Sequence, residues 1–127
     1  MPASLNGNIY YGPVSAPLLE FQFKNAKLLN SPVAQTTFPF PYPGTTPSIS
    51  ANGGQNGIVW ATSYTNPAVL YAFDAKTLTM LYNTNEAPFG RDHFGNGNKF
   101  ITPMIANGKV YVGTLSGVGV FGLLSQK

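Results

Sequence analysis

The sequence predicts an all-β protein made of about three β-propeller blades, each a four-stranded antiparallel sheet, with the last blade incomplete. The first observation behind this prediction is a phrase that recurs three times. The copies centre on the dipeptides Asn6-Gly7, Asn52-Gly53 and Asn107-Gly108. The first two copies lie 46 residues apart, and the second and third lie 55 apart. A period of this size is typical of repeats that each form one propeller blade.

The second observation is the punctuation of the chain. Fourteen glycines and eleven prolines divide it into short segments rich in Val, Ile, Tyr and Phe, which is typical of strands joined by turns. No window shows the apolar spacing of a helix. The expected strands are Pro2–Leu5, Ile9–Tyr11, Leu18–Phe23, Pro47–Ala51, Ile58–Ser63, Ala68–Phe73, Thr79–Tyr82, Phe100–Ala106, Lys109–Thr114 and Gly117–Leu123.

The repeated Asn-Gly dipeptides indicate how the first two strands of each blade are joined. Both central residues of a type I′ turn need a positive φ, which Asn and Gly tolerate best. We therefore expect tight hairpins at Asn6-Gly7 and Asn107-Gly108. In the middle copy the sequence 52–57 indicates a longer hairpin loop, which begins at Asn52-Gly53.

Alignment of the copies divides residues 1–127 into blades of about 1–44, 45–98 and 99–127. The fourth strand of the first blade is weakly marked and is expected within Lys27–Ala34. The third blade has three strands before the sequence ends. The single tryptophan, Trp60, aligns with Tyr11 and Val112 on second strands, which favours packing in the core or between blades.

Composition restricts the classes of function. Charged residues make up 9% of the chain, well below the roughly 25% usual for soluble domains, and such a surface suits an extracellular or periplasmic protein. The net charge is +3, but the basic residues are scattered singly, so a nucleic-acid interface is not expected. No apolar run approaches the ~20 residues of a membrane-spanning helix, and the first residues do not resemble a secretion signal.

Two segments favour a binding site, because they are expected to link a fourth strand to the next first strand. Segment 83–99 is rich in charges, and segment 31–46 contains a stiff run of aromatics and prolines. Together they predict a face for a ligand or partner, either a glycan or a protein, made by Phe40, Tyr42, Arg91, Asp92, His93 and Lys99. The alternative is that the prolines only stiffen a crossover and that Arg91 and Asp92 form a local ion pair.

Catalysis and cofactor binding find little support in the sequence. There is no cysteine and one histidine, so no thiolate or histidine-pair metal site is expected. The sequence around Ser116 lacks the spacing of a nucleophile elbow. We place no catalytic residue, cofactor or metal.

The stretch Ala72-Phe73-Asp74-Ala75-Lys76-Thr77-Leu78-Thr79-Met80-Leu81-Tyr82 resembles the pyrroloquinoline-quinone-like repeats of quinoprotein-type propellers. Their motif is Ala-x-Asp-x-x-Thr-Gly-x-x-x-Trp. Ala72, Asp74 and Thr77 match it, whereas Leu78 replaces the glycine and Tyr82 replaces the tryptophan. Independently of the resemblance, a short polar side chain such as Asp74 in a turn accepts hydrogen bonds from the backbone two residues on.

The resemblance implies a ring of seven or eight blades, of which three are a part, so the missing blades of a longer protein or further copies of the chain would complete it. The first functional hypothesis is a non-catalytic scaffold or binding module that self-associates. The second is a part of a quinone-dependent oxidoreductase whose cofactor residues lie in absent blades. The third is a cropped or engineered fragment.

Overall fold

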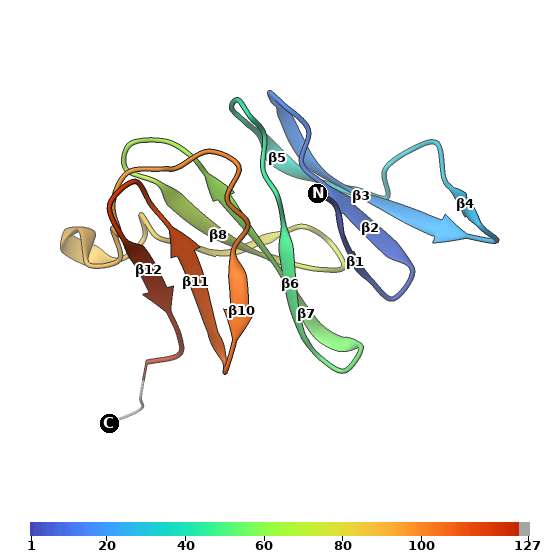
Figure 1. Ribbon diagram of the computed structural model, residues 1–127. Helices are drawn as coiled ribbons and strands as arrows, with labels where there is room; N and C mark the ends of the chain where they lie inside the picture. The colour runs from blue at the N-terminus through green and yellow to red at the C-terminus, as the bar shows by residue number, and fades with distance from the viewer. Residues whose placement is uncertain (125–127) are drawn as a thin grey trace.

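The computed structural model describes residues 1–124, which form three antiparallel sheets placed side by side (Figure 1). In the first sheet β1, β2, β3 and β4 follow one another, and β5 also pairs with β3. Its strands are β1 (Ala3–Leu5), β2 (Asn8–Tyr11), β3 (Ala16–Lys24), β4 (Lys27–Leu28) and β5 (Ala34–Phe40).

The second and third sheets repeat this up-and-down order with fewer strands. The second contains β6 (Ser48–Asn52), β7 (Gln55–Ser63), β8 (Val69–Asp74) and β9 (Met80–Asn83), and the third contains β10 (Met104–Ala106), β11 (Lys109–Gly113) and β12 (Val118–Phe121). A short 3-10 turn, η1 (Pro88–Gly90), lies between them in sequence. The prediction of an all-β protein with antiparallel sheets is confirmed, and each sheet falls within one of the three predicted repeat ranges.

The first and third hairpins are the tight turns that the sequence predicts. Leu5 pairs with Asn8 in the first sheet, so only Asn6 and Gly7 form the turn. Both have positive φ, 51° and 78°, as a type I′ turn requires. Asn107 and Gly108 repeat the arrangement with φ of 50° and 68°.

The prediction of a longer loop in the middle copy is wrong. Asn52 pairs with Gln55, so the turn is the two residues Gly53-Gly54. The extra length is absorbed in the strands instead, where the register shifts between Ser50 and Asn52 and Asn56 adopts a φ of 52°. A bulge of this kind inserts a residue into one strand without ending the pairing.

The fourth strand of the first sheet also differs from the prediction. The segment Lys27–Ala34 contributes the two-residue strand β4 at the end of β3 and, at Ala34, the first residue of β5. Most of that edge is covered by β5, which pairs with Ala16–Glu20 and lies in the segment expected to be a crossover. Prolines disfavour central strands, and here Pro17 and Pro39 face each other beside a register shift.

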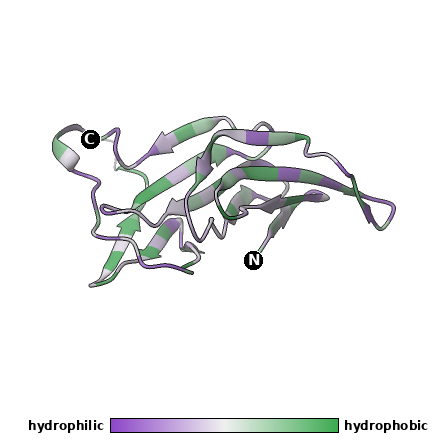
Figure 2. Cartoon of the chain, turned by 90° about the horizontal axis from the view of Figure 1, so that it is seen from above, coloured by the Kyte–Doolittle hydropathy of each residue, from purple (hydrophilic) through white to green (hydrophobic). Residues whose placement is uncertain are grey.

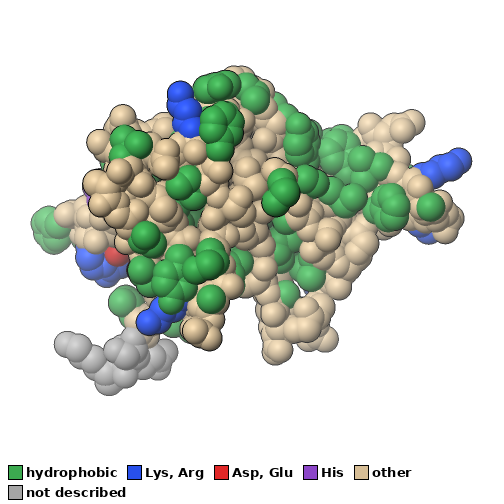
Figure 3. Space-filling view, viewed as in Figure 1, with side chains coloured by type: hydrophobic (Ala, Val, Ile, Leu, Met, Phe, Trp, Pro, Cys, Tyr) green, Lys and Arg blue, Asp and Glu red, His purple; other side chains and the backbone are tan. Residues whose placement is uncertain are grey.

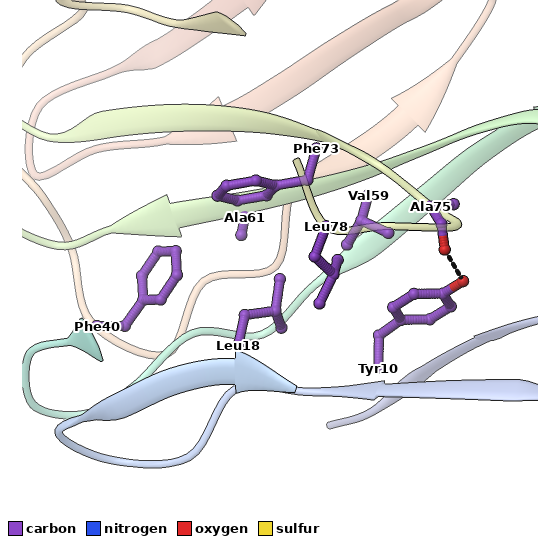
Figure 4. Packing of buried hydrophobic residues seen from close by; sticks show 8 residues of the cluster. All are labelled: Tyr10, Leu18, Phe40, Val59, Ala61, Phe73, Ala75 and Leu78. Carbon is purple, nitrogen blue, oxygen red and sulfur yellow. Dashed lines mark hydrogen bonds between the residues drawn. The ribbon is translucent and has the colours of Figure 1, made fainter. Parts of the chain in front are cut away.

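The core between the first two sheets consists of residues contributed by both. Tyr10, Leu18 and Phe40 from the first sheet are buried against residues of the second sheet and of the turn after β8 (Figure 4). These partners are Val59, Ala61, Phe73, Ala75 and Leu78. The aromatic rings of Phe38, Phe40, Tyr71 and Phe73 contact one another at this boundary, with centroid separations of 5.1 to 6.5 Å.

A second, smaller core lies between the second and third sheets. Leu70, Val110 and Val112 are buried there, and Trp60 packs against them as the sequence predicts. The direction in which the side chains pack corrects its alignment, however. Trp60 packs towards the third sheet as Tyr10 packs towards the second, whereas Tyr11 is exposed, so Trp60 corresponds to Tyr10 rather than to Tyr11.

The first strands of the three sheets are neighbours. β6 contacts both β1 and β10, and it is drawn between them in Figure 1. In each sheet the second and following strands lie successively farther from this row of first strands. Hydrophobic residues recur along the strands of all three sheets (Figure 2). Within residues 1–124, no helix is long and apolar enough to cross a membrane.

Candidate functional site

A groove of about 660 Å³ lies between the second and third sheets, and we call it the β9–β12 groove. Trp60 and Ala72 line it from the second sheet, and Val110 and Phe121 line it from the third. Leu123 and Leu124, which follow β12, also line it. Because most of these side chains are apolar, the groove offers an apolar surface with an aromatic wall to a bound group.

The aromatic wall is held in place by a hydrogen bond. The indole Nε1 of Trp60 donates to the hydroxyl of Ser50 at 2.9 Å. Because the polar atom of the indole is already bonded, its apolar face remains for packing and for the groove.

The mouth of the groove is polar. Arg91 donates two hydrogen bonds to the carboxylate of Asp92, from Nε at 2.7 Å and from Nη2 at 3.0 Å, and the hydroxyl of Tyr82 donates to the same carboxylate. All three residues line the groove. The ion pair between Arg91 and Asp92, which the sequence analysis gave as the alternative to a binding face, is therefore present.

Arg91, Asp92 and Tyr82 change one another's pKa values. The Arg91 guanidinium and the Tyr82 hydroxyl lower the pKa of Asp92 to about 2, because both stabilise the charged carboxylate. Burial, and then the neighbouring Asp92, raise the pKa of Tyr82 to about 12. At neutral pH the mouth therefore presents an ionised carboxylate, a guanidinium and a protonated phenol.

The residues of the predicted binding face are not gathered into one site. Arg91 and Asp92 line the groove, whereas Tyr42 and Lys99 do not. Those two meet elsewhere, with the Lys99 ammonium 5.0 Å from the centroid of the Tyr42 ring, a cation–π distance. His93 is exposed and follows the ion pair in sequence.

Phe40 does not belong to any exposed face. It is the last residue of β5 and its side chain is fully buried in the core between the first two sheets. A ligand on the surface has no access to this ring. The proline-rich pattern did not indicate that β5 would pair with β3 and turn Phe40 inward.

The motif residues around Asp74 form a turn after β8. Asp74 Oδ1 accepts hydrogen bonds from the backbone amides of Lys76 at 2.8 Å and Thr77 at 3.2 Å, as expected, and from the Thr77 hydroxyl at 3.3 Å. Leu78 occupies the place of the motif's glycine with a φ of 53°, a conformation that favours glycine. Its side chain is buried.

A second cavity, of about 220 Å³, lies between the first two sheets near their turns. Asn8 and Tyr10 line it. The Asn8 side-chain amide donates to Glu20 Oε1 at 2.5 Å, and the Tyr10 hydroxyl oxygen lies 3.3 Å from the same carboxylate oxygen. Glu20 is 1% exposed and its Oε2 has no partner among the described residues. Burial raises the pKa of its carboxyl above the ordinary value. The sequence contained no sign of this group, because an acid in a strand is ordinarily solvent-facing.

The described part of the chain contains no cluster of three or more His, Cys, Asp or Glu side chains suited to a metal ion. Comparisons with protein families, with curated proteins and with solved structures found no match to the chain. The arrangement of the β9–β12 groove suits binding, since it combines an apolar floor with a charged mouth.

Proposed function

We propose that the chain is a non-catalytic β-propeller scaffold or binding module, of the quinoprotein-like repeat type, whose three sheets are blades and whose ring is completed by self-association. The observation that carries the proposal is the packing order of the sheets. Neighbouring sheets bury apolar residues against each other, and their first strands are neighbours. The three sheets therefore form an arc, and each end sheet has one face that no neighbouring sheet of the arc covers.

Both ends of the arc carry apolar side chains that nothing in residues 1–124 covers. The outer face of the first sheet includes Tyr11 and Phe23, which are 48% and 47% exposed. The outer face of the third sheet includes Met104 and Val120, at 57% and 53%. Hydrophobic side chains gather over both of these regions in Figure 3. Faces of this kind favour association.

The low content of charged side chains supports a location outside the cytoplasm, extracellular or periplasmic. The β9–β12 groove supports a protein or glycan ligand, because aromatic walls and charged rims recognise both. No step of this proposal requires a catalytic group or cofactor.

Light scattering combined with gel filtration tests the self-association. The wild type should have a molar mass that is a multiple of 13.6 kDa, and Met104→Lys and Phe23→Lys should each reduce it to one chain while circular dichroism stays unchanged. Leu115→Lys is the matched control, because Leu115 is 67% exposed but lies in the turn between β11 and β12. A wild type that is strictly monomeric and cooperatively folded contradicts the proposal.

A further inference from the structure

Five Asn-Gly dipeptides occur in the chain, at positions 6–7, 52–53, 56–57, 96–97 and 107–108. Glycine has no Cβ, so its backbone nitrogen can closely approach the preceding side chain. When this nitrogen bonds to the asparagine Cγ, a succinimide ring forms, and the side-chain nitrogen takes up the amide proton and leaves as ammonia. Water then opens the ring at either carbonyl to give aspartate or isoaspartate. Because the dipeptides are identical, their reactivity depends on their surroundings in the fold.

The Asn96-Gly97 peptide is enclosed by its neighbours. The Gly97 amide, whose nitrogen would attack, donates a hydrogen bond to the Thr65 carbonyl at 2.9 Å, and the Asn96 carbonyl accepts one from the Leu115 amide at 3.2 Å. A Cβ added at Gly97 would lie 2.5 Å from the carbonyl carbon of Tyr64. Reaction at Asn96 therefore requires local unfolding of this segment.

The Asn56-Gly57 peptide is packed at the boundary between the first two sheets. The Gly57 carbonyl accepts a hydrogen bond from the Ala75 amide at 3.0 Å. A Cβ added at Gly57 would lie 2.5 Å from Leu5 Cδ2 and 2.8 Å from Ala75 Cβ. Movement of the Gly57 nitrogen towards the Asn56 side chain would disturb both the hydrogen bond and the packing.

The Asn6 side chain is held across the same boundary. Its Nδ2, the nitrogen that would leave as ammonia, donates to the Gly54 carbonyl at 2.6 Å. The carbonyl of the following residue, Gly7, accepts the Phe23 amide at 2.7 Å. Asn6 has to give up its hydrogen bond to Gly54 before its Cγ can meet the Gly7 nitrogen.

The two remaining dipeptides, Asn52-Gly53 and Asn107-Gly108, are open. All four residues are exposed, and a Cβ added at Gly53 or at Gly108 meets no atom within 4 Å. The two glycines lie in the two-residue turns that join β6 to β7 and β10 to β11 (Figure 1). At both places the glycine nitrogen can approach the asparagine Cγ without displacing packed atoms.

We propose that Asn52 and Asn107 are sites of spontaneous covalent modification, at which the folded protein forms a succinimide and then aspartate or isoaspartate. The fold protects the other three asparagines, Asn6, Asn56 and Asn96. The reaction consumes water and requires no enzyme, and it goes beyond the proposed function. Each conversion replaces a neutral amide by a carboxylate and so lowers the net charge of +3 by one.

Conversion of Asn107 also changes the third hairpin. Isoaspartate carries the main chain through its side-chain carboxyl and so adds one carbon atom to the two-residue turn between Ala106 and Lys109. A type I′ turn joins its strands because its twist matches theirs. The isoaspartate form should therefore pair β10 with β11 less well than asparagine does.

Mass spectrometry of proteolytic peptides measures the conversion at each asparagine. The wild type is incubated at mildly alkaline pH in buffer and, in parallel, in concentrated urea, with water enriched in a heavy oxygen isotope to label each new carboxyl. Trypsin cleaves after Lys and Arg, so Asn6, Asn96 and Asn107 fall on separate peptides. Asn52 and Asn56 share one peptide, and fragmentation of that peptide distinguishes them.

The ratio of the rate in buffer to the rate in urea removes the effect of the local sequence. This ratio should be highest for Asn52 and Asn107. For Asn6 it should be about two- to tenfold lower, the range of one neutral hydrogen bond. For Asn56 and Asn96 it should be at least about tenfold lower, because both require local opening of packed structure.

Gly54→Ala tests the protection of Asn6. The added Cβ would lie 2.8 Å from Asn6 Oδ1, so the side chain has to move and its hydrogen bond is lost. Conversion of Asn6 in buffer should then rise about two- to tenfold. Gly117→Ala is the matched control, because a Cβ there meets no atom within 4 Å. An unchanged rate at Asn6 in folded Gly54→Ala would overturn the protection assigned to it.

Two results in the wild type would overturn the inference as a whole. They are equal ratios at all five asparagines, or a ratio at Asn56 or Asn96 as high as that at Asn52. These results do not depend on whether Gly54→Ala folds. Asn52 lies in the middle sheet, so it serves as the reference whether or not the end faces of the arc are covered.

Asn107 lies in an end sheet and is therefore also measured in Met104→Lys, in which self-association is expected to be lost. A ratio there as low as that of Asn96 would overturn the assignment of Asn107. A strictly monomeric wild type with the expected order of ratios contradicts only self-association. A self-associating wild type with equal ratios overturns only this inference.

Discussion

The hydroxyl of Tyr10 lies 2.5 Å from the backbone carbonyl of Ala75 and donates a hydrogen bond to it across the boundary between the first and second sheets. Tyr10 is 1% exposed, and the two residues are 65 positions apart in the sequence. The same hydroxyl approaches Glu20 Oε1 at 3.3 Å. A single phenol therefore joins two sheets and supports a buried carboxyl.

Removal of this hydroxyl should weaken the boundary without a large change in packing. Tyr10→Phe should lower the free energy of unfolding by about 1–2 kcal/mol, because the Ala75 carbonyl and the Glu20 carboxyl each lose a buried partner. Urea denaturation measures the change. Tyr11→Phe is the matched control, since Tyr11 is exposed on the opposite face, and equal effects of the two substitutions would show that the boundary does not depend on Tyr10.

The buried Glu20 should make the protein less stable as the pH rises. Burial raises the pKa of its carboxyl in the folded state above 4.5, so the unfolded chain releases this proton first. Below pH 4.5 the carboxyl is protonated in both the folded and the unfolded state, so it does not change the free energy of unfolding. As the pH rises from 4.5 towards the pKa of the folded state, the free energy of unfolding falls. Glu20→Gln should remove the decline, so that its stability advantage over the wild type grows with pH.

Thermal unfolding at several pH values measures this difference. Glu86→Gln serves as the control, because it removes a carboxylate from an exposed turn and accounts for the general effect of net charge. A Glu20→Gln variant whose advantage is constant across the pH range contradicts a buried, titrating Glu20.

The turn after β8 should depend on the acceptor of Asp74. Asp74→Ala removes the oxygen that receives the amides of Lys76 and Thr77 and should cost about 1–2 kcal/mol of stability. Asp74→Asn keeps an oxygen in the same place and should cost less. Denaturation of both variants checks the order, and an alanine variant as stable as the asparagine variant would refute this role.

The pKa of Asp92 at the mouth of the β9–β12 groove should depend on Arg91 and Tyr82. Arg91→Ala should raise the pKa of Asp92 from about 2 towards its ordinary value, since the Arg91 hydrogen bonds make the largest contribution to lowering it. Tyr82→Phe should raise it by less, because one hydroxyl donor is lost. NMR titration of the Asp92 carboxyl gives both values, and an unchanged pKa in Arg91→Ala is incompatible with the ion pair.

The hairpin turns and most strands could be predicted because their signals are local. An Asn-Gly dipeptide between two apolar runs specifies its own turn, and both Asn6-Gly7 and Asn107-Gly108 behave accordingly. The two-residue turn of the middle hairpin is not evident from the sequence, because the bulge near Asn56 conceals the register. The same one-residue offset led to the alignment of Trp60 with Tyr11.

The candidate site was less predictable because it depends on pairing between distant segments. β5 pairs with β3 despite its prolines, which turns Phe40 inward and removes it from the predicted face. The charges of Arg91 and Asp92 indicate a polar site, but the position of these residues in one groove with Trp60 depends on the packing of the second sheet against the third. Burial of Glu20 also depends on neighbouring sheets and leaves no local signal.

A designed disulfide between the first two sheets tests the side-by-side arrangement of equivalent sheets most directly. The Asn6 side chain donates to the Gly54 carbonyl at 2.6 Å, and a Cβ added at Gly54 lies 3.5 Å from Asn6 Cγ. The chain has no cysteine of its own. After mild oxidation, Asn6→Cys/Gly54→Cys should lose both free thiols within one chain, whereas Asn6→Cys/Gly108→Cys should keep them, since a Cβ at Gly108 meets no atom within 4 Å. Two unreacted thiols in the first variant would contradict the arrangement of the sheets.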